Sequence, residues 1–117
     1  YYSDVGLCLT AAGKLALDMA LTEAEKNNPD VTDIKNMLDS AEVRTDADSG
    51  TVAYLWENTK WYDDFSEVRF IESLLQELDG VDFLFIRAGE DSDDTEMYGT
   101  FWENPLDMRL TRGIVFS

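Results

Sequence analysis

Residues 65–86, FSEVRFIESLLQELDGVDFLFI, carry the two clearest structural signals in the chain. After Ser66, a favourable N-cap, apolar residues recur at helical spacing, and Phe65 can pack on Phe70 as a hydrophobic staple. This pattern predicts an amphipathic helix that ends at Gly80, with a buried stripe formed by Val68, Ile71, Leu75 and Leu78. In residues 81–86, apolar residues occupy positions on both faces of an extended chain, which predicts a central strand.

The segments before and after residues 65–86 predict further helices and strands. Residues 4–9 predict a strand, Thr10 caps a helix over residues 11–26, and Pro29 suits the first position of a second helix. Period-two alternation around a turn at residues 46–50 predicts a hairpin, and further strands are expected at residues 97–102 and 108–116. The order β-α-α-β-β-α-β-β-β predicts an α+β fold, a mainly antiparallel sheet with helices packed on one face.

The composition limits the chemistry of the chain. It has 117 residues, 25 Asp plus Glu against 9 Lys plus Arg, a formal net charge of -16, no histidine and one cysteine. Fourteen aromatic residues argue for a folded core, and the length suits a single domain over residues 1–117. Ser-His-Asp and Cys-His catalysis are impossible without histidine, and Cys8 alone cannot complete a zinc site or an internal disulfide. We therefore expect a non-enzymatic protein that needs no cofactor or metal, with Cys8 buried.

The densest run of acidic residues lies at residues 90–96. Five carboxylates occur between residues 90 and 96, and no basic residue occurs between Arg87 and Arg109. This run suits a solvated hairpin loop, a divalent-cation site or a partner-binding surface. The candidate binding residues in this stretch are Glu90, Asp91, Asp93, Asp94, Glu96, Glu103 and Asp107.

A second group mixes acids with aromatic residues before the predicted third helix. Trp and Tyr are favoured residues at protein interfaces, and their rings also accept cations. Core packing explains most of these aromatics, but Trp61 and Tyr62 lie in a connection and are expected at the surface. The candidate binding residues of this group are Glu57, Asp63, Asp64, Trp61 and Tyr62.

The charge density suggests the kind of partner. Duplex DNA carries one charge per ~1.7 Å of axis, so 16 charges correspond to roughly 27 Å of duplex. A domain of this length has a long dimension of about 35 Å, so its charge density is comparable with that of a short duplex. Such a surface repels nucleic acids and anionic membranes and attracts a basic protein, such as a nuclease or a nucleic-acid-binding complex.

The short length, the acidic composition, the single cysteine and two short sequence segments give the chain a family resemblance. With Lys60-Trp61-Tyr62 and Ile86-Arg87-Ala88-Gly89-Glu90-Asp91, it resembles small acidic proteins carried by bacteriophages and prophages, over residues 50–105. The resemblance carries over no binding residues. It implies an inhibitor of a host defence complex, of the anti-restriction or anti-CRISPR type that mimics DNA.

Two other functions remain open. Helices on one sheet face would leave an aromatic face exposed, with Tyr54, Trp56, Tyr98 and Trp102, and this face would suit an adaptor module or a homodimer. The carboxylates of residues 90–96 could instead form a Ca²⁺-binding module. No apolar run approaches the ~18–20 residues of a membrane span, so a cytoplasmic protein is expected.

Overall fold

The computed structural model describes residues 1–111 and 113–116, and it confirms the α+β class. A five-stranded sheet has the order β2-β3-β1-β4-β5, with all neighbouring strands antiparallel. The strands are β1 (Ser3–Leu9), β2 (Glu42–Asp46), β3 (Thr51–Thr59), β4 (Phe83–Gly89), β5 (Thr95–Gly99), β6 (Arg109–Leu110) and β7 (Ile114–Val115). The helices are α1 (Ala11–Asn27), α2 (Val31–Ser40), α3 (Ser66–Glu77) and the single 3₁₀ turn η1 (Gly80–Asp82).

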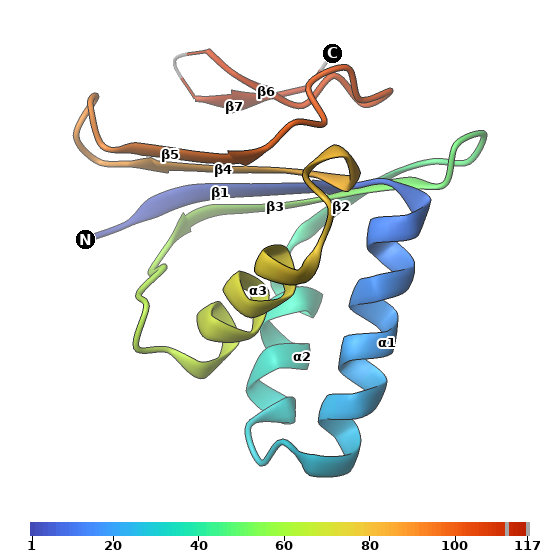
Figure 1. The fold of residues 1–117 in the computed structure, drawn as a ribbon. Helices are drawn as coiled ribbons and strands as arrows, with labels where there is room; N and C mark the ends of the chain where they lie inside the picture. Colours follow the sequence, from blue (N-terminus) through green and yellow to red (C-terminus); the bar gives the residue numbers. More distant parts are fainter. Residues whose placement is uncertain (112, 117) are drawn as a thin grey trace.

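The three α-helices cover one face of the sheet (Figure 1). In β1, Val5, Leu7 and Leu9 belong to the core on this face, whereas Cys8 belongs to the core on the opposite face. Strand β1 is buried on both faces because it lies between β3 and β4 in the centre of the sheet. The first strand of the chain therefore joins the hairpin β2–β3 to the hairpin β4–β5.

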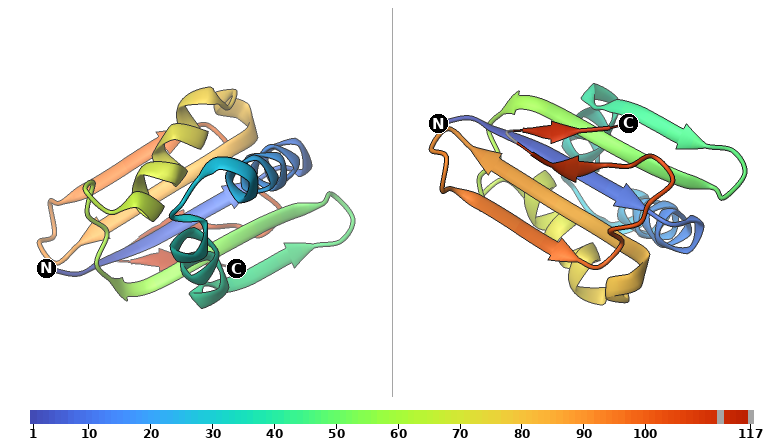
Figure 2. Two further views of the ribbon diagram at one scale, coloured as in Figure 1. Left: turned by 90° about the horizontal axis from the view of Figure 1, so that it is seen from below. Right: turned by 90° about the horizontal axis from the view of Figure 1, so that it is seen from above.

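The second face of the sheet is covered by the C-terminal segment, which corrects the expectation of an open aromatic face. The hairpin β6–β7 lies over this face (Figures 1 and 2), and Met108 packs there with Cys8, Leu84 and Ile86. Tyr54 and Trp56 face the helices instead and are buried. Tyr98 and Trp102 remain exposed, at 52% and 53%.

Several predicted boundaries shift in the structure. Where one strand was expected at residues 108–116, Arg109–Leu110 and Ile114–Val115 form two short antiparallel strands, β6 and β7. The strand expected at 97–102 spans 95–99, and residues 80–82 form the turn η1 before β4. Because strands of two residues show no period, alternation alone could not place β6 and β7.

The helix caps agree only in part with prediction. Thr10 caps α1 as expected, since its hydroxyl accepts the backbone N–H of Gly13 at 3.1 Å. Helix α2 begins at Val31, after Asp30, rather than at Pro29. In α3, Ser66 is the first helical residue and Phe65 is the N-cap, so no side chain caps this helix.

None of the helices in the described residues combines the length and apolar composition needed to cross a lipid bilayer.

Candidate functional site

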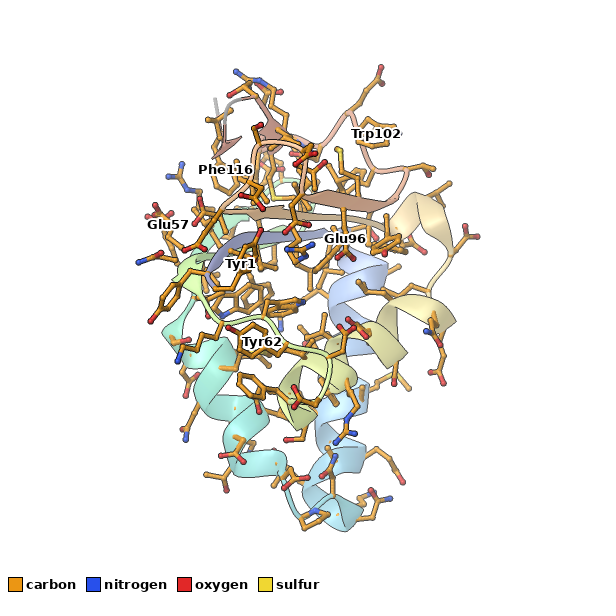
Figure 3. The ribbon with its side chains drawn as sticks, turned by 90° about the vertical axis from the view of Figure 1, so that its left-hand side faces the viewer. Tyr1, Glu57, Tyr62, Glu96, Trp102 and Phe116 are labelled. Atoms are coloured by element: carbon orange, nitrogen blue, oxygen red, sulfur yellow. The ribbon has the colours of Figure 1, made fainter. Side chains whose placement is uncertain are left out.

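The two acidic groups predicted from sequence meet at one end of the sheet. Ser3, at the start of β1, is in register with Thr59 at the end of β3 and with Gly89 at the end of β4. The segments that follow these two strands, residues 60–64 and 90–94, therefore leave the sheet on either side of the same strand. Figure 3 views this end, with Tyr1 between Glu57 and Glu96.

We call this region the acidic end, defined by Glu57, Asp63, Asp64, Glu90, Asp91 and Asp93. All six side chains are exposed. None of them forms an ion pair with any residue in 1–111 or 113–116. Elsewhere, several acids do have basic partners: Lys14 pairs with Asp18, Lys35 with Glu25, Arg44 with Glu42 and Arg109 with Asp107. The six carboxylates of the acidic end thus form no ion pair among the described residues, and the positive groups near them include Lys60 and the amino group of Tyr1.

Tyr1 links the two halves of the acidic end. Its backbone nitrogen donates to the Tyr62 hydroxyl at 3.0 Å, and that hydroxyl donates to the Tyr1 carbonyl at 2.9 Å. The Tyr1 hydroxyl donates to Asp94 on the other side. A further bond runs from the Asn58 N–H to the Asp4 carboxylate at 2.8 Å. These contacts hold the two loops on either side of β1 in a defined arrangement.

Arg87 neutralises two of the five carboxylates in residues 90–96. Its guanidinium lies 2.6 Å from Asp94 Oδ1 and 2.7 Å from Glu96 Oε1. Hydrogen bonds from Arg87 and Tyr1 lower the pKa of Asp94, while the Asp94 bond raises the pKa of Arg87. The sequence has no basic residue between Arg87 and Arg109, but Arg87 itself compensates the charges of Asp94 and Glu96. Arg87 and Glu96 pair across the hairpin β4–β5, a register that sequence reasoning did not use.

The two aromatic candidates have different positions. Trp61 is only 8% exposed and packs with its ring centroid 5.3 Å from that of Trp56 and 6.0 Å from that of Phe85. The expectation that it lies on the surface is wrong, because the connection folds back and completes the core beneath the helices. Tyr62 is partly exposed, and its hydroxyl holds Tyr1.

Glu103 and Asp107 are not brought to the acidic end. Strand β5 ends at Gly99, in register with Leu84 near the start of β4, so Glu103 follows from the opposite end of the sheet. Asp107 is ion-paired with Arg109. These two predicted residues therefore lie apart from the others.

A cleft next to the acidic end was not anticipated from sequence. It has a volume of about 420 Å³ and lies between α3 and strands β4 and β5. We call it the α3–β5 cleft, and its lining is formed by Asp63, Glu72, Leu75, Gln76, Phe83, Phe85, Glu96 and Tyr98. Burial, a hydrogen bond shared with Asp63 and the negative charges of Asp63 and Glu96 raise the pKa of Glu72 to about 7. Glu72 was missed because it lies within the predicted third helix, between the two acidic groups rather than in either of them.

The structure gives the Ca²⁺ alternative no ligand set. Among residues 1–111 and 113–116, no group of three or more His, Cys, Asp or Glu residues is placed to hold a metal ion. Asp94 and Glu96 of the proposed ligand run bind Arg87 instead.

Comparison with known proteins places the chain in no family. No protein-family model matches it, and neither a curated protein nor a solved structure shows significant similarity to it.

Proposed function

We propose that this chain is a non-enzymatic, protein-binding inhibitor that uses the acidic end to occupy the basic, nucleic-acid-binding surface of another protein. The observation that carries the proposal is the convergence of two acidic segments on either side of Tyr1. Six exposed carboxylates there have no ion-pair partner in the described chain. A basic surface would supply the missing positive charges and release the counterions of both partners.

The dimensions of the protein support the comparison with nucleic acid. Its longest extent is 39 Å, so 16 net charges correspond to one per about 2.4 Å of length, against one per ~1.7 Å of DNA duplex. A charge of this density also accelerates association with a positively charged channel.

The narrower assignment rests on the resemblance to small phage proteins. The resemblance implies a host nuclease or a nucleic-acid-binding defence complex as the partner, and the bacterial cytoplasm as the site of action. Inhibition would follow because the chain and the nucleic acid compete for one surface. The charge density and the convergence of acids favour a basic partner.

Matched charge reversals test the proposal. One variant carries Glu90→Lys, Asp91→Lys and Asp93→Lys, which changes three exposed carboxylates without touching the Arg87 network. The control carries Glu23→Lys, Asp39→Lys and Asp48→Lys, three exposed acids on α1, α2 and the β2–β3 turn, and has the same net charge.

Proteins captured from a bacterial lysate by the wild-type chain are purified and titrated with each variant. We expect the acidic-end variant to lose about 100-fold in affinity for a basic partner, and the control to lose less than about tenfold. Equal losses in the two variants would show that net charge, rather than the acidic end, drives binding. Unchanged affinity in both would contradict the proposal altogether.

A further inference from the structure

The α3–β5 cleft combines the features that recognise one kind of ligand. Its walls include two stacked aromatic rings, Phe85 and Tyr98, with centroids 5.8 Å apart and an interplanar angle of 23°. Its acidic groups come from three elements: Asp63 from the β3–α3 connection, Glu72 from α3 and Glu96 from β5. Its volume of about 420 Å³ lies within the range of small-molecule sites.

The acidic groups of the cleft differ in how their charge is balanced. Glu96 is satisfied within the fold, since Arg87 Nε donates to Oε1 at 2.9 Å and the Tyr98 hydroxyl donates to Oε2 at 2.9 Å. Asp63 and Glu72 have no ion-pair partner among residues 1–111 and 113–116. Two carboxylates that share a hydrogen bond repel each other when both are ionised, and a cation between them removes that repulsion.

We propose that the α3–β5 cleft binds the guanidinium of an arginine side chain from the basic partner, with Asp63 and Glu72 as its counter-ions and Tyr98 as the ring beside it. A planar guanidinium is favoured because it stacks on aromatic rings and binds carboxylates through two parallel hydrogen bonds. Within the fold, the Arg87 guanidinium binds the Asp94 carboxylate through two hydrogen bonds and also pairs with Glu96. The inference rests on the proposed function, because Asp63 belongs both to the cleft and to the acidic end.

Binding in the cleft is coupled to proton release. The pKa of Glu72, raised to about 7, leaves this carboxyl mostly protonated at pH 6 and mostly ionised at pH 8. The groups that face it are Asp63, Glu96 and Tyr98, with Arg87 behind Glu96. A cation prefers the ionised form, so its affinity for the cleft rises by about tenfold between pH 6 and pH 8.

A direct test uses ethylguanidinium chloride as the probe. The full chain, labelled with ¹⁵N, is titrated at pH 8 and followed by backbone amide chemical shifts, with NaCl at equal ionic strength as the reference. We expect saturable shifts at Glu72, Gln76, Glu96 and Tyr98, and weaker binding at pH 6. Shifts that NaCl reproduces, or that do not saturate, would overturn the inference.

Two variants locate the probe. Glu72→Gln keeps the shape of the side chain and should lower the ethylguanidinium affinity at least about tenfold, because it removes one counter-ion. Glu77→Gln loses the same charge from an exposed position of α3 outside the cleft, and should leave the affinity unchanged. Equal losses in both variants would mean that the probe responds only to net charge.

The outcomes separate this inference from the proposed function. If ethylguanidinium fails to bind the cleft while the acidic-end reversal still weakens partner binding, the cleft inference fails and the proposed function stands. If ethylguanidinium binds in the cleft but the acidic-end reversal has no effect on partner binding, the proposed function fails and a cation site remains.

Discussion

Replacement of Glu72 by Gln should stabilise the fold in a pH-dependent manner. The folded state raises the pKa of this carboxyl from 4.5 to about 7, chiefly through burial and then through Asp63 and Glu96. Below about pH 4.5 both folded and unfolded chains hold the proton, so the stability that the bound proton provides is fully present. It is lost as the pH rises through about 7, where the folded chain must release the proton. Gln cannot ionise and avoids this loss.

The size of the effect follows from the shift. The difference between 4.5 and about 7 corresponds to about 3 kcal/mol at full strength. Glu72 is only partly buried, and solvent screening reduces the effect to about 1–2 kcal/mol. We therefore expect Glu72→Gln to leave the free energy of unfolding nearly unchanged at about pH 4.5 and to raise it by about 1–2 kcal/mol above about pH 8.

Urea unfolding followed by tryptophan fluorescence measures this difference, because Trp56 and Trp61 are buried in the helix-side core. Glu77→Gln removes one negative charge from the same helix without lining the cleft, and should change stability by less than about 0.5 kcal/mol. A stabilisation by Glu72→Gln that is the same at low and high pH, or no larger than that of the control, would refute the reasoning.

Two further outcomes test the packing of the sheet. Gly99→Ala should destabilise the fold by about 2–3 kcal/mol in urea unfolding, because Gly99 has φ +84° and a Cβ would lie 2.2 Å from the Phe83 carbonyl oxygen. Gly113→Ala, where a Cβ would meet nothing within 4 Å, is its control, and equal effects would contradict this account. Cys8 is fully buried and burial raises its pKa to about 12, so a thiol reagent should label the native chain only as fast as it unfolds. Rapid stoichiometric labelling without denaturant would show that Cys8 is accessible to the reagent in the native chain, which would contradict its burial.

The parts of the fold that sequence reasoning predicted well are those with a long periodic signal. The apolar residues of α3 recur at helical spacing because one stripe of the helix is buried, and this spacing predicted the helix. The residues of β4 are apolar at consecutive positions because the strand is buried on both faces, and this run predicted a central strand. The C-terminal segment left no such signal. Its two-residue strands and Met108 cover the second sheet face, where Ala53 of β3 packs, whereas the alternating positions Tyr54 and Trp56 belong to the helix-side core.

The candidate site was predictable only in part for a similar reason. The acidic runs are visible in the sequence, but their meeting depends on β1 lying between β3 and β4, a pairing of segments more than 40 residues apart. The neutralisation of Asp94 and Glu96 depends on the hairpin register that places Arg87 beside them. The α3–β5 cleft depends on how helix α3 packs against the hairpin β4–β5, and no local sequence pattern predicts this packing.

The central claim, that the acidic end occupies a nucleic-acid-binding surface, is tested most directly by competition. The purified partner is loaded with labelled DNA or RNA, and the chain is added while the bound label is measured by fluorescence anisotropy. We expect the label to be displaced by the wild-type chain and by the Glu23, Asp39 and Asp48 reversal variant, but not by the Glu90, Asp91 and Asp93 variant. A ternary complex, in which the partner holds the labelled nucleic acid and the chain together, would contradict the claim.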